Sequence, residues 1–349
     1  MKIAPRLFRV RRLVLGILPL ILLIVWPLAA RADGGPTFSG QATAVSGSAL
    51  GLPLTFSDTG FQSGSEFAAE ASGPSVSVAN PTGSGTLLSV ETLHAATIAQ
   101  GDRVRSEASL ANVSLSVAGN TVSASFLMAR AMAVCTGSGP AVSGSSELAN
   151  VTINGQPIAV SGAPNQTVSV PPVTVHINKQ SSTTNAIDVT ALEVVVANPI
   201  GGAPLADVSF SRVHADVTCA GQPNCGTGKD FITGGGWIIP QSGSGKATFA
   251  VAGGIKNGAF WGHLEYIDHN TGLKVHGTGV TAYAVTGPTS RHIEGTADIN
   301  GAVGTYKTDV ADNGEPGRGV DTFAITLSTG YTASNTLGGG NIQLHQPCK

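Results

Sequence analysis

Three histidines, two acids and a lysine occur within FWGHLEYIDHNTGLKVHGTG, residues 260–279. If residues 269–272 form the loop of a hairpin, Glu265 lies opposite His276, and His263 shares their face of the sheet. Imidazole and carboxylate groups are suitable zinc ligands, so His263, Glu265 and His276 are a candidate metal site. The alternative is a cross-strand polar cluster that faces water, because alternation along the two strands explains every polar position. We favour this second interpretation.

A second group of acids lies in TDVADNGEPGRGVD, residues 308–321. Carboxylate oxygens around tight turns can hold calcium, an ion common outside cells. The spacing departs from that of an EF-hand loop, and Arg318 could instead pair with a neighbouring acid. We therefore expect no cofactor and keep calcium as the open alternative, with the candidate ligands Asp309, Asp312, Glu315 and Asp321.

Motifs for covalent catalysis are absent from the sequence. No serine lies in a G-x-S-x-G pattern, no H-E-x-x-H occurs, and GSGK at 243–246 lacks the spacing of a phosphate-binding loop. We therefore expect a protein that is not an enzyme. Trp237, Trp261 and Tyr283 could line a ligand pocket if the second half of the chain forms an open barrel, although small barrels are usually filled by side chains.

The first 32 residues have the features of a secretory signal peptide. Basic residues precede the apolar run 13–26, and Ala30-Arg31-Ala32 gives a small-x-small cleavage pattern, so we expect cleavage near Ala32. Cleavage there removes six basic residues and no acid, which leaves 13 basic and 21 acidic residues and a net charge of −8. Such a charge disfavours nucleic-acid binding. No later apolar stretch is long enough to span a bilayer.

Short β-branched segments separated by Gly, Ser, Pro and Asn predict an all-β protein. We expect a β-sandwich-like domain over residues 33–220, a linker over 221–228, and an antiparallel meander over 229–349 that forms a small barrel or sandwich. Asn154-Gly155, Asn257-Gly258, Asn300-Gly301 and Asn313-Gly314 are hairpin signals. FQSGSEFAAEAS, residues 61–72, is the one segment where we expect a turn or two of helix.

Four cysteines in an exported chain predict two disulfides, with three connectivities open. We favour Cys135–Cys219 and Cys225–Cys348, because each pair closes one expected domain. Pairing of the first and last strands of the second domain would also bring Cys225 towards Cys348. A four-cysteine zinc site is the alternative, but paired C-x-x-C spacing is missing.

Two sets of motifs resemble known bacterial families. DFITGGGWII, GHLEYIDHNTGLKVH, IEGTADING, VADNGEPGRGVDTFAI and LGGGNIQLH, within 229–346, look like the domain that follows the choice-of-anchor P region (the post-COAP domain). ELANVTINGQPIAV, PNQTVSVP, VHINKQ and VSFSRVHADVTC resemble the choice-of-anchor P family itself. The resemblance implies a bacterial exported or cell-surface protein and brings no activity, ligand or catalytic residue. Neither an LPxTG-like signal nor a tail helix is visible.

We therefore expect a secreted or cell-surface protein that acts in adhesion, envelope structure or extracellular interaction, with an unknown surface or matrix partner. A small-ligand or glycan-binding β-barrel is the first alternative, and an extracellular hydrolase without a known motif is the second.

Overall fold

Strands account for most of the chain. The computed structural model describes residues 34–226, 229–241 and 243–348, so the expected signal peptide lies outside the described residues. The described residues form 23 strands in three antiparallel sheets and contain no helix, which confirms the all-β prediction. None of these ranges holds a helix that could cross a membrane.

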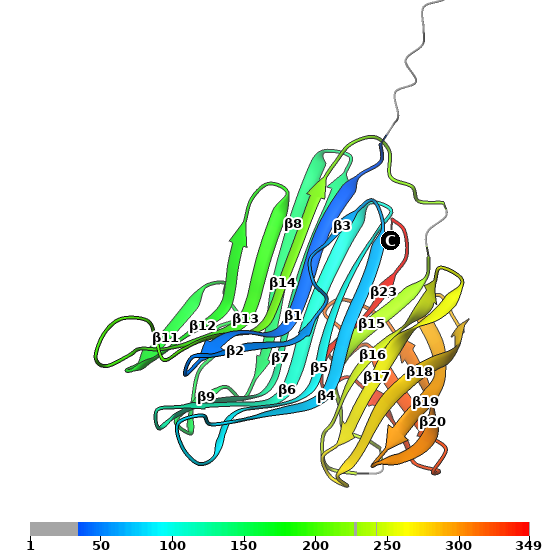
Figure 1. Ribbon diagram of the computed structural model, residues 1–349. Coiled ribbons are helices and arrows are strands. Elements are labelled where there is room, and N and C mark those ends of the chain that lie inside the picture. The colour runs from blue at the N-terminus through cyan, green and yellow to red at the C-terminus, as the bar shows by residue number, and fades with distance from the viewer. Residues whose placement is uncertain (1–33, 227–228, 242, 349) are drawn as a thin grey trace, which may run out of the picture. The chain divides into compact units, whose positions relative to one another are not determined.

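Two seven-stranded sheets form the N-terminal half (Figure 1). Sheet A consists, in spatial order, of β11 (Gln166–Val170), β12 (Val173–Ser182), β13 (Ala186–Val196), β14 (Ala206–Thr218), β1 (Thr37–Ala49) and β2 (Leu52–Asp58), with β3 (Gln62–Gly64) also paired to β1. Sheet B consists of β10 (Gln156–Pro157), β9 (Thr152–Ile153), β7 (Asn120–Thr136), β6 (Arg103–Val117), β5 (Thr86–Gln100) and β4 (Phe67–Ala79), with β8 (Gly139–Ala149) also paired to β7.

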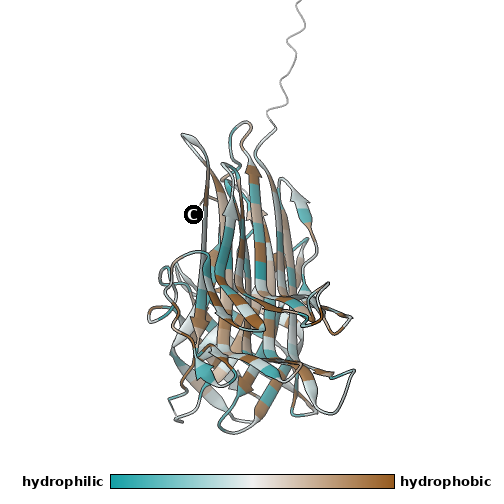
Figure 2. Cartoon of the chain, turned by 90° about the vertical axis from the view of Figure 1, so that its left-hand side faces the viewer, coloured by the Kyte–Doolittle hydropathy of each residue, from teal (hydrophilic) through white to brown (hydrophobic). Residues whose placement is uncertain are grey.

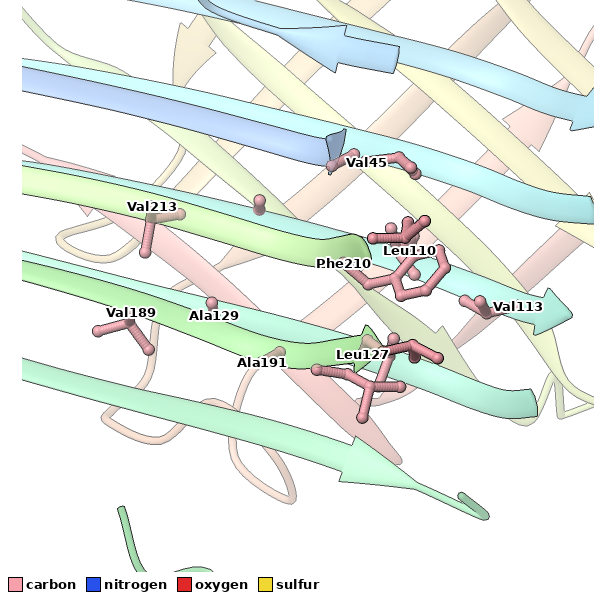
Figure 3. Close-up of a cluster of buried hydrophobic side chains, with 14 of the residues drawn as sticks. Val45, Leu110, Val113, Leu127, Ala129, Val189, Ala191, Phe210 and Val213 are labelled. Carbon is pink, nitrogen blue, oxygen red and sulfur yellow. The ribbon is translucent and has the colours of Figure 1, made fainter. Parts of the chain in front are cut away.

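The apolar faces of sheets A and B meet in one core. Alternation places every second side chain of a strand on the same face, and Figure 2 shows the resulting bands of apolar and polar residues. Figure 3 shows Val45 and Phe210 of sheet A beside Leu110 and Leu127 of sheet B. All four side chains are fully buried. The N-terminal half is therefore a β-sandwich, as predicted.

Sheet C contains the C-terminal strands. Its spatial order is β22 (Thr332–Thr336), β21 (Thr322–Leu327), β20 (Ala302–Ala311), β19 (Ser290–Ile299), β18 (Leu273–Val285), β17 (Ala259–Asp268), β16 (Ala247–Lys256), β15 (Phe231–Ile238) and β23 (Gly339–His345). The first and last strands pair, with Phe231 opposite His345, as predicted. The sheet curls into a half-barrel around its own core, where Phe249 stacks on Phe323 with ring centroids 4.0 Å apart.

Turn chemistry agrees with most of the hairpin signals. Both residues of Asn154-Gly155, Asn257-Gly258 and Asn300-Gly301 have positive φ, as a two-residue type I′ turn requires. Asn313-Gly314 instead lies inside the long loop between β20 and β21.

The expected helical turns at residues 61–72 are wrong. This segment forms β3 and the start of β4, and β4 pairs along its length with β5. Backbone pairing with a neighbouring strand here overrides the local preference of the alanines and glutamates for helix.

Both favoured disulfides are present. Cys135, at the end of β7, is bonded to Cys219, just after β14, so this bond joins sheet B to sheet A. Cys225, ahead of β15, is bonded to Cys348, which follows β23. The bonds close loops with sequence separations of 84 and 123 residues. Loops of this length restrict the unfolded chain by about 4–5 kcal/mol each on the entropic description.

Sheet C packs against the outer face of sheet B, so the chain has three layers. The clearest sign is β5, which is buried on both faces from Thr92 to Gln100. A small apolar group, Ala68, Ile98, Phe231 and Trp261, lies between the two sheets. Gly235 of β15 approaches so closely that a Cβ there would lie 2.0 Å from the Ser109 hydroxyl oxygen. Residues 34–349 form one compact unit, and the boundary expected at 221–228 stays a prediction.

Asp230, immediately ahead of β15, fixes the start of sheet C. Its carboxylate accepts hydrogen bonds from Arg291 Nε at 2.6 Å and Nη2 at 2.5 Å, from the Tyr283 hydroxyl, and from Gln346 Nε2 at 2.9 Å. Burial opposes ionisation of this carboxyl, but the donors, Arg291 foremost, hold its pKa below the ordinary value. Arg291 is fully buried. The pair therefore anchors the entry strand through a desolvated charge.

We expect Asp230→Ala to lower the free energy of unfolding by about 3 kcal/mol, because it leaves the buried guanidinium of Arg291 without its partner. Urea denaturation measures the change. Lys179→Ala is the control, because the ion pair of Lys179 with Glu193 is half exposed and should contribute less than about 1 kcal/mol. Equal losses in the two variants would contradict this assignment.

Candidate functional site

The histidine hairpin has the predicted register. Glu265 of β17 lies opposite His276 of β18, and Asp268 lies opposite Leu273. Glu265 Oε1 accepts hydrogen bonds from His263 Nε2 at 2.6 Å and from His276 Nδ1 at 2.5 Å. The two imidazole rings lie 5.1 Å apart between centroids. One ligand atom from each of the three residues lies within 4.8 Å of the others.

The solvent-facing interpretation of this cluster is wrong for Glu265, whose exposed fraction is 0%. The outer face of β17 lies against β4 of sheet B and not against water. Burial disfavours a charged ring, but the hydrogen bond to Glu265 and the charge of Glu70 on β4 together raise the pKa of His263. A buried carboxylate thus lies between two imidazoles where sheets B and C meet.

A second polar cluster lies deeper between the same sheets, and the sequence analysis missed it. Glu107 of β6 accepts hydrogen bonds from His94 Nε2 at 3.3 Å and from the Thr233 hydroxyl at 2.6 Å. Because that hydroxyl gives its hydrogen to Glu107, the His345 Nε2–H donates to the Thr233 oxygen at 2.8 Å. Ser72 Oγ lies 3.1 Å from His94 Nδ1 and can donate to it. Through these bonds the group joins sheet B to β15 and β23, the paired first and last strands of sheet C.

Burial sets the protonation of this group. It lowers the pKa of His345 to about 3, and the positive charge of Arg105 acts in the same direction. Burial alone would raise the pKa of Glu107, but the hydrogen bond from His94, with the charges of His94 and His345, holds it below the ordinary value. At neutral pH Glu107 is therefore a carboxylate and the imidazole of His345 is neutral.

Ser72, His94 and Glu107 form a hydroxyl–imidazole–carboxylate series in hydrogen-bonding order, as in serine hydrolases. His94 and Glu107 are buried at 0% and 5% exposure. Ser72 is not among the residues that line the arginine-bearing cavity or three other cavities of the described part of the chain. We therefore interpret the series as part of the contact between the sheets.

A cavity of about 470 Å³ opens beside this contact. Three arginines of sheet B line it, Arg103, Arg105 and Arg130, and we call it the arginine cavity. Arg103 pairs with Asp102 at 2.6 Å. Burial, and then the charge of Arg103, lowers the pKa of Arg105, while the charges of Glu315, Asp312 and Asp102 act in the opposite direction. The remaining wall includes Glu107, Met132, Ser143, Ser145, Glu315, Pro316 and Gln343.

The four candidate calcium ligands do not form a group with metal-ligand spacing, although burial, and then the charge of Asp312, raises the pKa of both Glu315 and Asp321. Asp309 bonds to His292 at 2.7 Å, and Asp312 accepts from the backbone amide of Leu344 at 2.8 Å. Glu315 pairs with Arg130 at 3.1 Å and accepts from Asn341. Asp321 accepts three backbone amides, and burial raises its pKa to about 6. In the described part of the chain, the one group with metal-ligand spacing is the histidine hairpin.

Each of the three aromatic residues of the expected pocket contacts another group of the protein. Trp261 packs edge-on against Phe231 between sheets B and C, and Trp237 lies under the Lys246 ammonium at 4.1 Å. Tyr283 bonds to Asp230. Each ring has a structural neighbour, and none of the three lines the arginine cavity.

No family model, curated protein or solved structure matches this chain. One signal could have revealed the contact between the sheets: TLLSVETLHAATIAQ, residues 86–100, carries little charge and does not alternate strictly, as expected of a strand buried on both faces.

Acid should weaken the fold through His345. Because its pKa is lower in the folded chain (about 3) than in the unfolded chain (6.5), the unfolded state binds more protons between these values, and stability falls as the pH drops from 6.5 towards 3. Between pH 6.5 and 4.5 the loss should be roughly 2–3 kcal/mol. Urea denaturation at several pH values measures the free energy of unfolding of the wild type and of His345→Gln. We expect this free energy to depend less steeply on pH in the variant. The half-exposed His176→Gln is the control and should keep the wild-type slope; an unchanged slope in His345→Gln would contradict the assignment.

Proposed function

We propose that this chain is an exported, non-enzymatic protein that serves outside the cytoplasm as a structural or adhesive module, in the manner implied by its resemblance to the choice-of-anchor P family. The pairing of all four cysteines carries the proposal. Disulfides persist in oxidising compartments and are rare where thiols are kept reduced. The arrangement indicates an oxidising environment for the folded protein.

The net charge of the mature chain and the positions of its two disulfides are compatible with this role. A mature chain with a net charge of −8 is soluble and is not drawn to nucleic acid. One bond joins the two sheets of the sandwich, and the other joins the segments on either side of sheet C, so both parts are braced covalently. Such bracing suits a protein that must keep its shape without chaperones.

Fractionation of the native organism tests the location. We expect the protein in the medium or the cell envelope, without residues 1–32 by N-terminal sequencing, and with no thiol that reacts with a maleimide before reduction and four after it. A mainly cytoplasmic protein with reactive thiols would overturn the proposal.

The arginine cavity supports a second candidate function, the binding of a small carboxylate-bearing sugar. Its volume of about 470 Å³ is within the range of small-molecule sites. A guanidinium binds a carboxylate through paired hydrogen bonds, and three arginines, Arg103, Arg105 and Arg130, line this cavity. Glu315, Gln343 and Ser143 offer partners for hydroxyl groups.

Calorimetric titration with glucuronate and galacturonate, compared with glucose and galactose, tests this binding. We expect the acids to bind and the neutral sugars to bind at least roughly tenfold more weakly, because only the acids pair with a guanidinium. Arg130→Met should weaken acid binding by about tenfold, whereas Arg212→Met, in a separate cavity of sheet A, should not change it. Equal binding of acids and neutral sugars, or of the two variants, would contradict the assignment.

A further inference from the structure

Two buried carboxylate oxygens beside the histidine hairpin have no hydrogen-bond partner. One is Oε2 of Glu265, whose side chain is fully enclosed, and the other is Oε1 of Glu70 on β4. Glu70 lies close enough for its charge to act on His263. Buried polar atoms in folded proteins are nearly always paired, so two such orphans around one cluster require an explanation.

The hydrogen bonds within the cluster do not explain these two unpartnered oxygens. Both histidines donate to the same oxygen, Oε1 of Glu265, and leave Oε2 without a donor. His263 and His276 come from neighbouring strands and direct their nitrogens towards a single point. Convergence of two imidazole nitrogens and a carboxylate, each from a paired β-strand, is an arrangement that fixes ligands before an ion arrives.

We propose that His263, Glu265 and His276 bind a divalent transition metal, with Zn²⁺ as the preferred ion, and that Glu70 of sheet B balances its charge. Two neutral imidazoles and two carboxylates match the charge of one dication. In the bound state each ring coordinates through the nitrogen that faces Glu265, and its hydrogen is carried on the other ring nitrogen. Glu265 would supply one carboxylate oxygen to the ion.

This site would join the two parts of the molecule. Three ligands belong to β17 and β18 of sheet C, whereas Glu70 belongs to β4 of sheet B. Metal binding would therefore hold sheet C against the sandwich, in addition to the buried group around Glu107. The proposal is independent of the extracellular role and of the arginine cavity.

Titration of the untagged mature protein with Zn²⁺, after treatment with a chelator, tests the proposal. We expect one ion per chain with a Kd of about 1 µM or lower at pH 7.5, and a higher melting temperature in the presence of the ion because it binds only the folded chain. Co²⁺ should give the visible absorption of a four-coordinate site. Acidification should weaken binding, because protons compete with the ion for its ligands.

Variants locate the ion. His276→Ala changes the most exposed ligand and should weaken binding by roughly 100-fold or more, and Glu70→Gln by a smaller factor. His292→Ala is the matched control, because His292 also lies between two carboxylates, Glu294 and Asp309, and it should leave binding unchanged. Circular dichroism checks that each variant is folded, and His263→Gln replaces His276→Ala if the latter is not.

Two results would overturn the proposal. The first is absence of Zn²⁺ binding tighter than about 100 µM by the folded wild-type protein. The second is binding that survives the loss of His276 or His263, or that is lost in His292→Ala, because the ion would then lie elsewhere.

Discussion

The contact between sheets B and C is organised around a buried charge, the carboxylate of Glu107. A carboxylate removed from water is tolerated only when donors surround it. Here one donor, His94, comes from its own sheet, and the other, Thr233, comes from sheet C. Separation of the two sheets would leave the charge half satisfied. The contact is therefore directional, and its small apolar component around Ile98 and Phe231 does not fix the register alone.

The same contact between sheets B and C produces the two sites to which we assign possible functions, the histidine hairpin and the arginine cavity. Glu265 of the histidine hairpin is enclosed because β17 of sheet C lies on β4, and the arginine cavity exists because the loop carrying Glu315 approaches β6 and β7. Both places hold unlike charges in partial isolation from water, where electrostatic interactions are stronger than at a free surface. The proposed sites therefore lie at the contact between sheets B and C and not within the core of sheet C.

Local sequence patterns predict the strands, the three Asn-Gly hairpins and the pairing of Glu265 with His276, because each depends on residues close together in the sequence. The number and positions of the cysteines, with the expected domains, predict both disulfides. The local patterns fail where burial comes from a distant layer. A polar strand face covered by another polar face has the same alternating pattern as one in water, so Glu265 was assigned to solvent. The bond between Glu107 and Thr233 spans 126 residues, and no local signal marks such a pair. Tertiary packing decided these positions.

The Cys225–Cys348 bond has a mechanical consequence. It connects the segment that enters sheet C to the segment that leaves it, and β15 and β23 pair directly beside it. Tension applied between residue 348 and the sandwich would run through the sulfur atoms and bypass the strands between them. Sheet C would then carry almost none of the load, and it could stay folded while the rest of the molecule is pulled.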